Sequence, residues 1–410
     1  MRILYFTQYY PPEVGATQTR AQEMSRFLVE HGHRVTVVTE VPNHPSGIIP
    51  PQYRGRLSER VLEDGIDVLR LWVWASPDKN FKSRMRFYLS YMGMAALAGT
   101  LLRGKYDLVY ATSPPLFVGA AGLAAATMRG IPFVFEVRDL WPESAVALGE
   151  LSSPRAIRAA EGLERLLYRR ASRILAVTQG IRSRLLERGV EPNRLALIPN
   201  GANTDRFQFS AEGRAAVRRD MGWQDNFVVM YAGIHGIAQG LETLIEAALL
   251  LHDVSAVRFV FVGEGPKKAE LAERVASLKL NNVHLLPEVP ASRMPAYLSA
   301  ADCTIVPLRD EPLFRGALPS KMFEAWACER PIVLSVSGEA AQVLQEARAG
   351  VACQPEDPTG MAEAIRYLHA HPDEATAMGK RGREFVLAHY SRVAQAGSLE
   401  RLLQDAVSAR

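Results

Sequence analysis

Short apolar runs alternate along this chain with longer stretches of helical character. Such runs, bounded by turn residues, are typical of buried strands in parallel sheets. In the first half of the chain we expect strands at residues 3–7, 34–39, 66–72, 108–111, 133–137 and 174–177. In the second half we expect strands at residues 227–232, 258–262, 283–285, 303–307 and 332–335. Strands that alternate with helices predict βαβ units and therefore parallel sheets.

Two series of this kind predict an α/β protein of two Rossmann-like domains that face each other across a cleft. The length of 410 residues agrees with two domains. We place the domains at residues 1–203 and 204–385, because the stretch 198–203 is rich in turn residues. A last helix is expected near residues 381–406, and we expect the segment 386–410 to pack back on the first domain.

The composition indicates a reduced protein of the cytoplasm. With 48% hydrophobic residues the chain can bury substantial cores. Its three cysteines, Cys303, Cys328 and Cys353, are far apart and lack metal-ligand spacing, so we expect free thiols. The strand pattern at the first residues predicts no signal peptide. The longest apolar stretches are shorter than the roughly 18 residues that suggest a spanning helix.

The charge of the chain is unevenly distributed. Residues 1–205 hold 26 Lys and Arg against 19 Asp and Glu, a balance of +7, whereas residues 206–410 hold 22 against 25, a balance of −3. The basic first half predicts an anionic partner, either a membrane surface or a phosphorylated acceptor. No nucleic-acid-binding module is recognisable, so we expect no nucleic-acid partner.

The segment 318–327 is the most informative part of the sequence. Pro319, Ser320 and Lys321 precede or begin an apolar helix, where free backbone N–H groups attract an anion. Glu324, three residues after Lys321, lies on the same helix face and can accept hydrogen bonds from sugar hydroxyls. An anion site beside a hydroxyl acceptor suits a ribose diphosphate. The alternative is an ordinary surface ion pair between Lys321 and Glu324.

Glycine-rich turns follow two of the expected strands in the second half. The first contains Gly233, Gly236 and Gly240, and the second contains Gly263 and Gly265, followed by Lys267 and Lys268. Glycine lets a phosphate approach the backbone, and ligands of open parallel sheets bind beyond the carboxyl ends of the strands. We therefore expect both turns and the Ser320–Glu324 segment to meet at one site, although each turn alone is also typical of a tight βα connection.

These motifs resemble the two-Rossmann-domain (GT-B) glycosyltransferases, in the large retaining family-four group. The matching pieces are residues 198–203, 231–241, 261–266, 300–302 and 320–332, followed by Gly338 and Glu339. The segments 138–144 and 42–47 resemble the N-acetyl-L-fucosamine transferase-like branch of this group. The likeness extends over nearly the whole chain.

The resemblance implies a donor sugar linked to a nucleoside diphosphate, expected to be UDP, bound mainly by the C-terminal domain. It implies that Glu324 holds the ribose hydroxyls, while Lys321 and the Gly236 backbone hold the diphosphate. Further donor-binding residues are expected to be Ser320, Gly265, Lys268 and Gly15.

Three departures from the wider family limit this transfer. The family often has a glutamate seven residues before the position of Glu324, and this chain has Gly316 there. The family often has a histidine directly before the aspartate that corresponds to Asp139, and this chain has Arg138. The family usually has an arginine and a lysine after the first strand of the C-terminal domain, and this chain has Ile234 and Gln239 at those positions.

In the first half, polar residues that follow expected strands are candidates for acceptor binding and catalysis. Gly15 at a helix start could let a phosphate come close. Glu13 could contact an acceptor hydroxyl. The alternative is a Pro-Pro turn with a solvated Glu13. Asp139 is our candidate for stabilising positive charge on the transferred sugar, or for orienting the acceptor, unless it forms a structural pair with Arg138. We assign acceptor or phosphate contacts to Arg138, Asn43 and His44.

A basic and aromatic stretch at residues 79–89 is a candidate membrane-binding helix. Helices of this kind can lie in a membrane interface, although an ordinary helix with one buried face is the alternative. The residues assigned to it are Lys79, Phe81, Lys82, Arg84, Arg86 and Phe87.

Taken together, the sequence predicts a cytoplasmic glycosyltransferase associated peripherally with the inner face of the cell membrane. It is expected to be retaining, to need no metal or other cofactor, and to transfer a hexosamine-type sugar to a polyprenyl-diphosphate-linked saccharide. Two alternatives stay open: a sugar-nucleotide epimerase of similar architecture, and a non-catalytic nucleotide-sugar-binding subunit, which Gly316 would favour.

Overall fold

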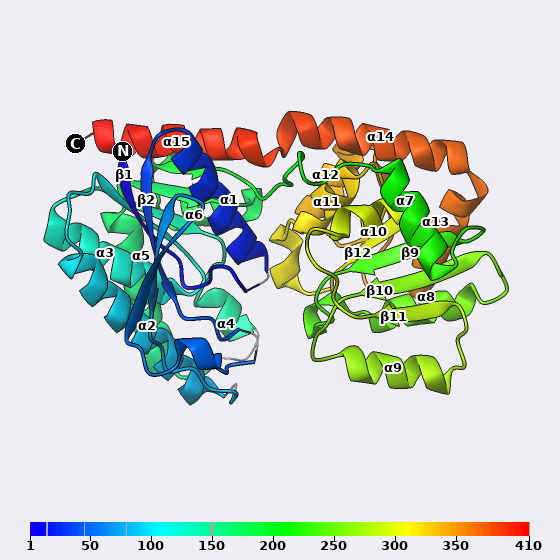
Figure 1. Cartoon of the computed structure of the whole chain (residues 1–410), viewed down its shortest axis with the longest axis horizontal. Helices are drawn as coiled ribbons and strands as arrows, with labels where there is room; N and C mark the ends of the chain where they lie inside the picture. The colour runs from blue at the N-terminus through cyan, green and yellow to red at the C-terminus, as the bar shows by residue number, and fades with distance from the viewer. Residues whose placement is uncertain (14, 45, 79, 148–150, 410) are drawn as a thin grey trace. The chain divides into compact units, whose positions relative to one another are not determined.

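The structure is a computed structural model that describes residues 1–13, 15–44, 46–78, 80–147 and 151–409 (Figure 1). It divides into two compact units. Unit 1 comprises Met1–Pro199 and Val393–Arg410, and unit 2 comprises Asn200–Arg392. Each unit is built around one sheet with helices on both faces, which makes both of them Rossmann-like.

Unit 1 holds an eight-stranded sheet with the order β3-β4-β2-β1-β5-β6-β7-β8. The strands are β1 (Arg2–Phe6), β2 (Arg34–Glu40), β3 (Ser58–Glu63), β4 (Ile66–Leu71), β5 (Leu108–Thr112), β6 (Phe133–Val137), β7 (Arg173–Ala176) and β8 (Leu195–Leu197). All neighbours pair in parallel except β3, which pairs antiparallel with β4. The helices are α1 (Ala16–Glu30), η1 (Pro51–Tyr53), α2 (Phe81–Leu101), α3 (Leu116–Arg129), α4 (Glu143–Ala147), α5 (Pro154–Arg170), α6 (Gln179–Glu187), η2 (Pro192–Arg194) and α15 (Arg392–Ser408).

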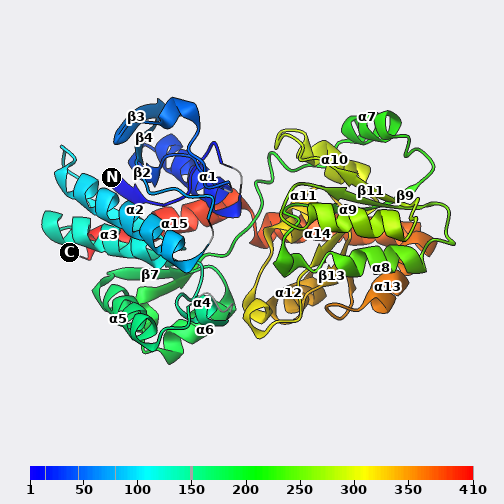
Figure 2. The ribbon, with the colours of Figure 1, turned by 90° about the horizontal axis from the view of Figure 1, so that it is seen from below.

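The two faces of this sheet carry separate cores, because successive strand residues point to opposite sides. Leu4 and Phe6 of β1 pack with α2, α3 and α5, whereas Ile3 and Tyr5 pack with α1 and α15. Figure 2 shows α2 and α3 running side by side. The C-terminal helix α15 is therefore part of the core of unit 1.

Unit 2 holds a six-stranded parallel sheet with the order β11-β10-β9-β12-β13-β14. The strands are β9 (Phe227–Ala232), β10 (Val257–Val262), β11 (Val283–Leu286), β12 (Cys303–Pro307), β13 (Ile332–Ser335) and β14 (Gly350–Ala352). The helices are α7 (Ala211–Met221), η3 (Ile237–Gln239), α8 (Glu242–Leu250), α9 (Lys268–Ser277), α10 (Met294–Ala300), η4 (Pro312–Gly316), α11 (Ser320–Ala327), α12 (Glu339–Ala347), α13 (Pro358–Ala370) and α14 (Pro372–His389).

Here too the strands serve two cores. Val228 and Met230 of β9 pack with α11, α12 and α14, and Val229 and Tyr231 pack with α8 and α13 (Figure 1). The alternation turns the Tyr231 ring to one face of the sheet near the end of β9, and this position matters for the site described below.

All eleven expected strands are present, but three short or edge strands were missed. The antiparallel edge strand β3 has only half-buried and exposed residues in alternation, and β8 and β14 have three residues each. Such segments bury too little apolar surface to leave a distinct run in the sequence. The boundary between the units falls after Pro199, a few residues before the expected one at 203.

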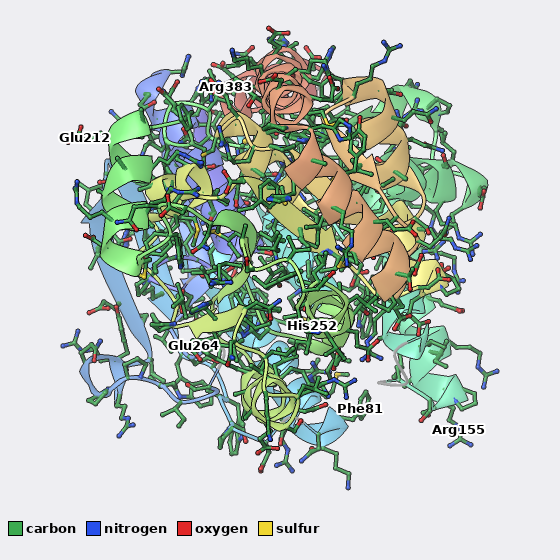
Figure 3. All side chains as sticks on the ribbon, turned by 90° about the vertical axis from the view of Figure 1, so that its right-hand side faces the viewer. Phe81, Arg155, Glu212, His252, Glu264 and Arg383 are labelled. Carbon is green, nitrogen blue, oxygen red and sulfur yellow. The ribbon has the colours of Figure 1, made fainter. Side chains whose placement is uncertain are left out.

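The expected single helix near residues 381–406 is wrong, because the chain breaks between α14 and α15. Ala202 and Ser391 form a parallel β-bridge at that break. The Arg392 guanidinium donates to the Gly201 carbonyl (2.7 Å), and Arg383 of α14, labelled in Figure 3, donates to the carbonyls of Thr204 and Phe207. Helix α14 thus stays in unit 2, and the return to unit 1 begins at Val393 rather than at residue 386.

None of the helices in the described part of the chain is both long and apolar enough to cross a membrane.

Candidate functional site

In unit 2 two glycine turns meet at the carboxyl ends of the adjacent strands β9 and β10. Gly233 (φ +141°), Gly263 (φ +146°) and Gly265 (φ +156°) have backbone conformations that L side chains rarely adopt. A Cβ on Gly263 would lie 2.1 Å from the Gly233 carbonyl oxygen, and one on Gly265 would lie 2.4 Å from the His235 carbonyl oxygen. The close approach of the two turns therefore requires glycine.

Backbone hydrogen bonds join the same two turns. The His235 N–H donates to the Glu264 carbonyl (2.8 Å), and the Lys267 N–H donates to the His235 carbonyl (3.0 Å). Glu264, labelled in Figure 3, lies in the second turn. The two turns consequently form one backbone surface beyond the ends of the strands.

Helix α11 directs Lys321 to this surface. The Lys321 Nζ donates to the Tyr231 hydroxyl (2.6 Å) and lies 4.1 Å from the centre of the Tyr231 ring. The Tyr231 hydroxyl in turn donates to the Ile234 carbonyl (2.6 Å). A Cβ on Gly233 would lie 2.4 Å from the Lys321 Nζ, so the ammonium occupies the space beside the first turn. The predicted convergence of both turns with the start of α11 is confirmed.

Burial lowers the pKa of Lys321 to about 7, and the nearby Glu324 carboxylate opposes this shift. Burial also raises the pKa of the Tyr231 hydroxyl, so this group stays protonated. A partly desolvated ammonium beside glycine-rich backbone gains more from an anion than a fully hydrated one does. The arrangement is suited to a phosphate or diphosphate.

Ser320 and Glu324 lie on the same short helix as Lys321, both partly buried. Ser320 is its first residue, and Pro319 is the N-cap, one position earlier than expected. Glu324 lies one turn beyond Lys321, as the spacing predicts.

Gly236 and Lys268 differ from the sequence-based expectation. Gly236 precedes the 3₁₀ helix η3, which separates the first turn from α8, so the dipole of α8 does not begin at this glycine. The Lys268 ammonium donates to the carbonyls of Gly263 (2.9 Å) and Leu286 (3.0 Å) and to Glu264 Oε1 (2.5 Å). Lys268 braces the second turn in this structure instead of presenting its charge to a ligand.

Asp302, in the family-like segment 300–302, has a structural role. It accepts hydrogen bonds from Arg214 (2.6 Å), Arg218 (3.0 Å) and the Val228 N–H (2.7 Å). These bonds tie α7 to the start of β9 and leave the aspartate remote from the glycine turns, which follow the other end of that strand.

His235 is the residue of this site that sequence reasoning missed. Its side chain is fully buried, with the ring 5.9 Å from that of Tyr231 and 6.2 Å from that of Phe261 between ring centres. Burial and then the Lys268 charge lower its pKa to about 4, so the ring is neutral. The conformation of the turn directs the His235 side chain inward, and the sequence pattern gives no signal for that direction.

Unit 1 contains a cavity of about 180 Å³ near the ends of β1 and β2 and the start of α2. Polar and aromatic side chains line it: Tyr9, Asn43, His44, Gly47, Ser76, Asp78, Ser83, Arg84, Phe87 and Tyr88. It brings together four residues singled out from the sequence, Asn43, His44, Arg84 and Phe87. Since each molecule takes up about 30 Å³ in liquid water, this volume corresponds to roughly six water molecules.

Glu13 and Asn43 support this cavity. Glu13 Oε1 accepts the N–H groups of Asn43 and His44, both at 2.6 Å, and burial raises the pKa of its carboxyl. The Asn43 amide donates to the buried Glu40 (2.8 Å) and to the Val41 carbonyl (3.0 Å). In this structure Glu13 therefore holds the loop, and the Asn43 NH₂ group points inward.

Arg138 and Asp139 follow β6 and are partly buried. Asp139 accepts a hydrogen bond from the Ser144 hydroxyl (2.8 Å), and burial lowers the pKa of Arg138. A column of rings leads from this segment to the cavity: Trp141 meets Phe117 edge-on (5.5 Å between centres), and Phe117 stacks on Tyr88 (6.1 Å).

Gly15 is the N-cap of α1 and has an extended backbone that any residue adopts. A Cβ there would meet only the flexible Gln18 side chain. The structure therefore gives no geometric reason for glycine at this position.

Helix α2 presents cations and apolar side chains to solvent. Lys82 and Arg86 are exposed, and so are Phe81, Leu89 and Leu97 (43%, 42% and 57%). Figure 3 labels Phe81, the first residue of the helix. The Arg86 guanidinium lies 5.9 Å from the ring centre of Trp74, which is itself half-exposed. Lys79, also assigned to this surface from the sequence, lies outside the described residues.

Two Rossmann-like units in one chain, with a last helix that returns to the first unit, are the architecture of GT-B glycosyltransferases. Two family models match the chain: Glycosyl transferase 4-like domain over residues 15–201, and Glycosyl transferases group 1 over residues 226–371. The chain belongs to this glycosyltransferase superfamily.

Individual proteins agree with this assignment. WcaI of Escherichia coli (strain K12), named as a colanic acid biosynthesis glycosyl transferase, is 26% identical over 396 residues, with 92% of this chain and 94% of WcaI covered. Among solved structures, sucrose-phosphate synthase from Thermosynechococcus elongatus matches with a TM-score of 0.76 at 20% identity, over 100% of both chains. Anabaena HepE in complex with UDP-glucose matches with a TM-score of 0.75 at 18% identity, over 99% of this chain and 100% of HepE. At these identities the two structures support the fold alone.

Proposed function

We propose that this protein is a retaining glycosyltransferase that acts in the synthesis of a cell-surface polysaccharide. It moves an N-acetylhexosamine or an N-acetyl-6-deoxyhexosamine from UDP to a polyprenyl-diphosphate-linked saccharide. The likeness to WcaI over nearly the whole chain supports the polysaccharide role. The resemblance of segments 138–144 and 42–47 to the N-acetyl-L-fucosamine transferase-like branch supports the choice of sugar.

The observation that carries the proposal is the position of the Lys321 ammonium beside the Gly233 turn. We assign the donor diphosphate to this ammonium and to the backbone of the two turns. We assign to Glu324, one turn further along the same helix, the hydrogen bonds from the ribose hydroxyls. HepE, which shares the fold, has been crystallised with UDP-glucose, and this favours a uridine nucleotide for the present chain.

For the acceptor, the cavity in unit 1 supplies hydrogen-bonding groups and aromatic faces. His44, Arg84 and Asp78 offer both donors and acceptors, and Tyr9 and Tyr88 offer ring surfaces for a saccharide. The exposed cations and apolar side chains of α2, which begins at this cavity, would face the anionic membrane that carries a lipid-linked acceptor.

In the proposed reaction the bond between the sugar C1 and the diphosphate oxygen breaks, and a bond between the acceptor oxygen and C1 forms on the same face. The acceptor proton passes to an oxygen of the departing diphosphate. Lys321 and the backbone N–H groups stabilise the charge that develops on the diphosphate. Asp139 stabilises the positive charge that develops on the sugar, and its bond from Ser144 fixes its orientation. Because Lys321 and the backbone supply this stabilisation, we expect activity without a divalent metal.

Two other functions make different predictions. An epimerase would convert the free nucleotide sugar without an acceptor, and a binding subunit would neither transfer nor hydrolyse the donor. The replacement of the family glutamate by Gly316 is the observation in favour of the binding subunit. Gly316 is the last residue of η4, which packs on α12. This segment is therefore folded, but it lacks the carboxylate that the family glutamate would supply.

Mass spectrometry of products decides among these functions. Purified protein is incubated with a panel of UDP-sugars and one polyprenyl-diphosphate saccharide, with and without EDTA. We expect one UDP-sugar to give a glycosylated lipid and free UDP in both conditions, and Asp139→Asn to abolish most of the product. Conversion of a UDP-sugar without acceptor would identify the epimerase, and donor binding without any product would identify the non-catalytic subunit. Wild-type turnover by Asp139→Asn would remove the proposed role of Asp139.

A further inference from the structure

His235 is a buried histidine for which the described part of the protein offers neither ring nitrogen a hydrogen-bond partner. Buried polar atoms are nearly always paired, and leaving them unpaired destabilises the fold. A phenylalanine would fill the same space between Tyr231 and Phe261 without this cost. Packing alone therefore does not explain a histidine at this position.

The ring lies directly beneath the two glycine turns of unit 2. Its Nε2 is 3.5 Å from the point where a Cβ on Gly263 would be, and that point is 2.1 Å from the Gly233 carbonyl oxygen. The charges of Lys268, Glu264 and Lys321 are close enough to act on the ring. His235 thus faces the same surface at which Lys321 is placed to hold an anion.

Small or exposed neighbours flank His235 in the first turn. Gly233 and Gly236 stand on either side of the Ile234–His235 pair, and the Ile234 side chain is 55% exposed. The hydrogen bonds of the His235 N–H and carbonyl with Glu264 and Lys267 fix its backbone. A ring nitrogen therefore reaches the surface of the turn by rotation of the His235 side chain.

We propose that His235 is a binding residue of the donor site: when a nucleoside diphosphate occupies the glycine turns, the Nε2–H group of His235 donates a hydrogen bond to a diphosphate oxygen. The inference rests on the proposed nucleotide-sugar function and adds a contact to it. A neutral imidazole can donate through one nitrogen while the other accepts. Nucleotide binding then satisfies a group that has no hydrogen-bond partner among the described residues, and this favours the bound state.

NMR of the wild-type protein tests the contact without any mutation. Ring nitrogens labelled with ¹⁵N are followed while UDP, or inorganic pyrophosphate, is added. We expect the Nε2 resonance of one histidine, assigned through its loss in His235→Phe, to shift with both ligands. If UDP binds by calorimetry and the His235 resonances do not move, this inference is overturned while the proposed function stands. If no nucleotide binds the wild-type protein, the proposed function itself fails.

Two variants and a matched control measure the contribution to binding. His235→Phe should weaken UDP binding about tenfold or more, as expected for a hydrogen bond to a charged group, and His235→Gln, which keeps a donor, should recover part of the loss. Thr304→Val removes another buried polar atom, in β12, for which the described part of the chain offers no hydrogen-bond partner, and it should leave UDP affinity unchanged. Both His235→Phe and Thr304→Val should unfold at or above the wild-type temperature without nucleotide. UDP affinity of His235→Phe within threefold of wild type would contradict the proposal.

Discussion

Lys321 combines two properties that oppose each other. Its ammonium is held against a tyrosine ring and partly removed from water, which lowers its pKa to about 7. The same placement beside Gly233 makes it available to an anion. The free protein bears the cost of burying the charge, and a bound diphosphate would relieve it.

Removing this ammonium is expected to impair the reaction strongly. A hydrogen bond to a charged group contributes about 1.5–3 kcal/mol, so Lys321→Ala should lower kcat/KM roughly 10- to 150-fold. Steady-state kinetics, with the UDP-sugar that the product panel selects, measures the loss. A decrease of less than about threefold would contradict the assigned role.

The lowered pKa of Lys321 also predicts a pH dependence of nucleotide binding. A bound diphosphate raises the pKa of the ammonium, so between about pH 7 and the higher pKa of the complex the protein takes up a proton on binding. UDP affinity should therefore fall as pH rises from about 7.5, by up to about tenfold per pH unit. Calorimetry in two buffers of different ionisation enthalpy would detect the proton.

Lys321→Met is the control for that measurement. The variant should bind UDP more weakly, but with an affinity that no longer declines with pH over the same range. An equal decline in both proteins would assign the titration to another group.

The predicted site residues themselves illustrate the limit of sequence reasoning at this scale. Lys321 and Glu324 could be chosen because their spacing on a helix is local. The structural role of Lys268 could not be predicted, because its three acceptors come from the turn after β10 and from the last residue of β11, which meet only in the fold. Glu13 was expected at an acceptor hydroxyl, and it accepts backbone N–H groups of a loop about thirty residues away in the sequence.

At the scale of elements, α2 presents a basic and apolar surface to solvent. The helix has no acidic residue, and its exposed side combines Lys82 and Arg86 with Leu89 and Leu97. Its hidden side contributes Tyr91 and Ala95 to the core. The sequence predicted the basic and aromatic character, and the fold decides which of these side chains remain exposed.

Reversing two of these charges should weaken binding to an anionic bilayer. Each cation near such a surface contributes about 1 kcal/mol, so the double variant Lys82→Glu and Arg86→Glu should reduce partitioning to anionic vesicles roughly tenfold or more. Arg84 is left intact because it lines the cavity. Flotation with anionic and neutral vesicles measures the effect.

A double variant in unit 2, Arg219→Glu with Lys380→Glu, controls for net charge, because both residues are exposed and the overall charge changes equally. It should partition like the wild type. Equal recovery of the wild-type protein with neutral and anionic vesicles would argue against electrostatic docking altogether.

At the scale of the whole molecule, the chain forms unit 1 first and then unit 2, and α15 returns to unit 1. Leu399 and Leu403 of this helix are fully buried with Ile3 and Tyr5 of the first strand. The two ends of the sequence therefore share one core, and the stability of unit 1 depends on a segment nearly 400 residues from its start.

Shortening one of these side chains tests that dependence. Leu403→Ala should lower the free energy of unfolding by about 2–5 kcal/mol, since it leaves a cavity in a packed core. Calorimetry should show the loss in the transition that involves unit 1. Val393→Ala, at an exposed position of the same helix, should change stability by less than about 0.5 kcal/mol. A negligible effect of Leu403→Ala would mean that α15 does not contribute to that core.

The sequence by itself determined the two Rossmann-like sheets, most of their strands, and the Lys321–Glu324 pair at the start of a helix. Strand runs, helix starts and side-chain spacing are local properties, so they can be recognised in the sequence. Only the tertiary structure decided that the turn after β9 meets the turn after β10, and that His235 points inward between them. It alone divided the last helical region between two units. These features depend on which distant segments pack together, and one residue's inward or outward direction in a glycine turn leaves no periodic signal.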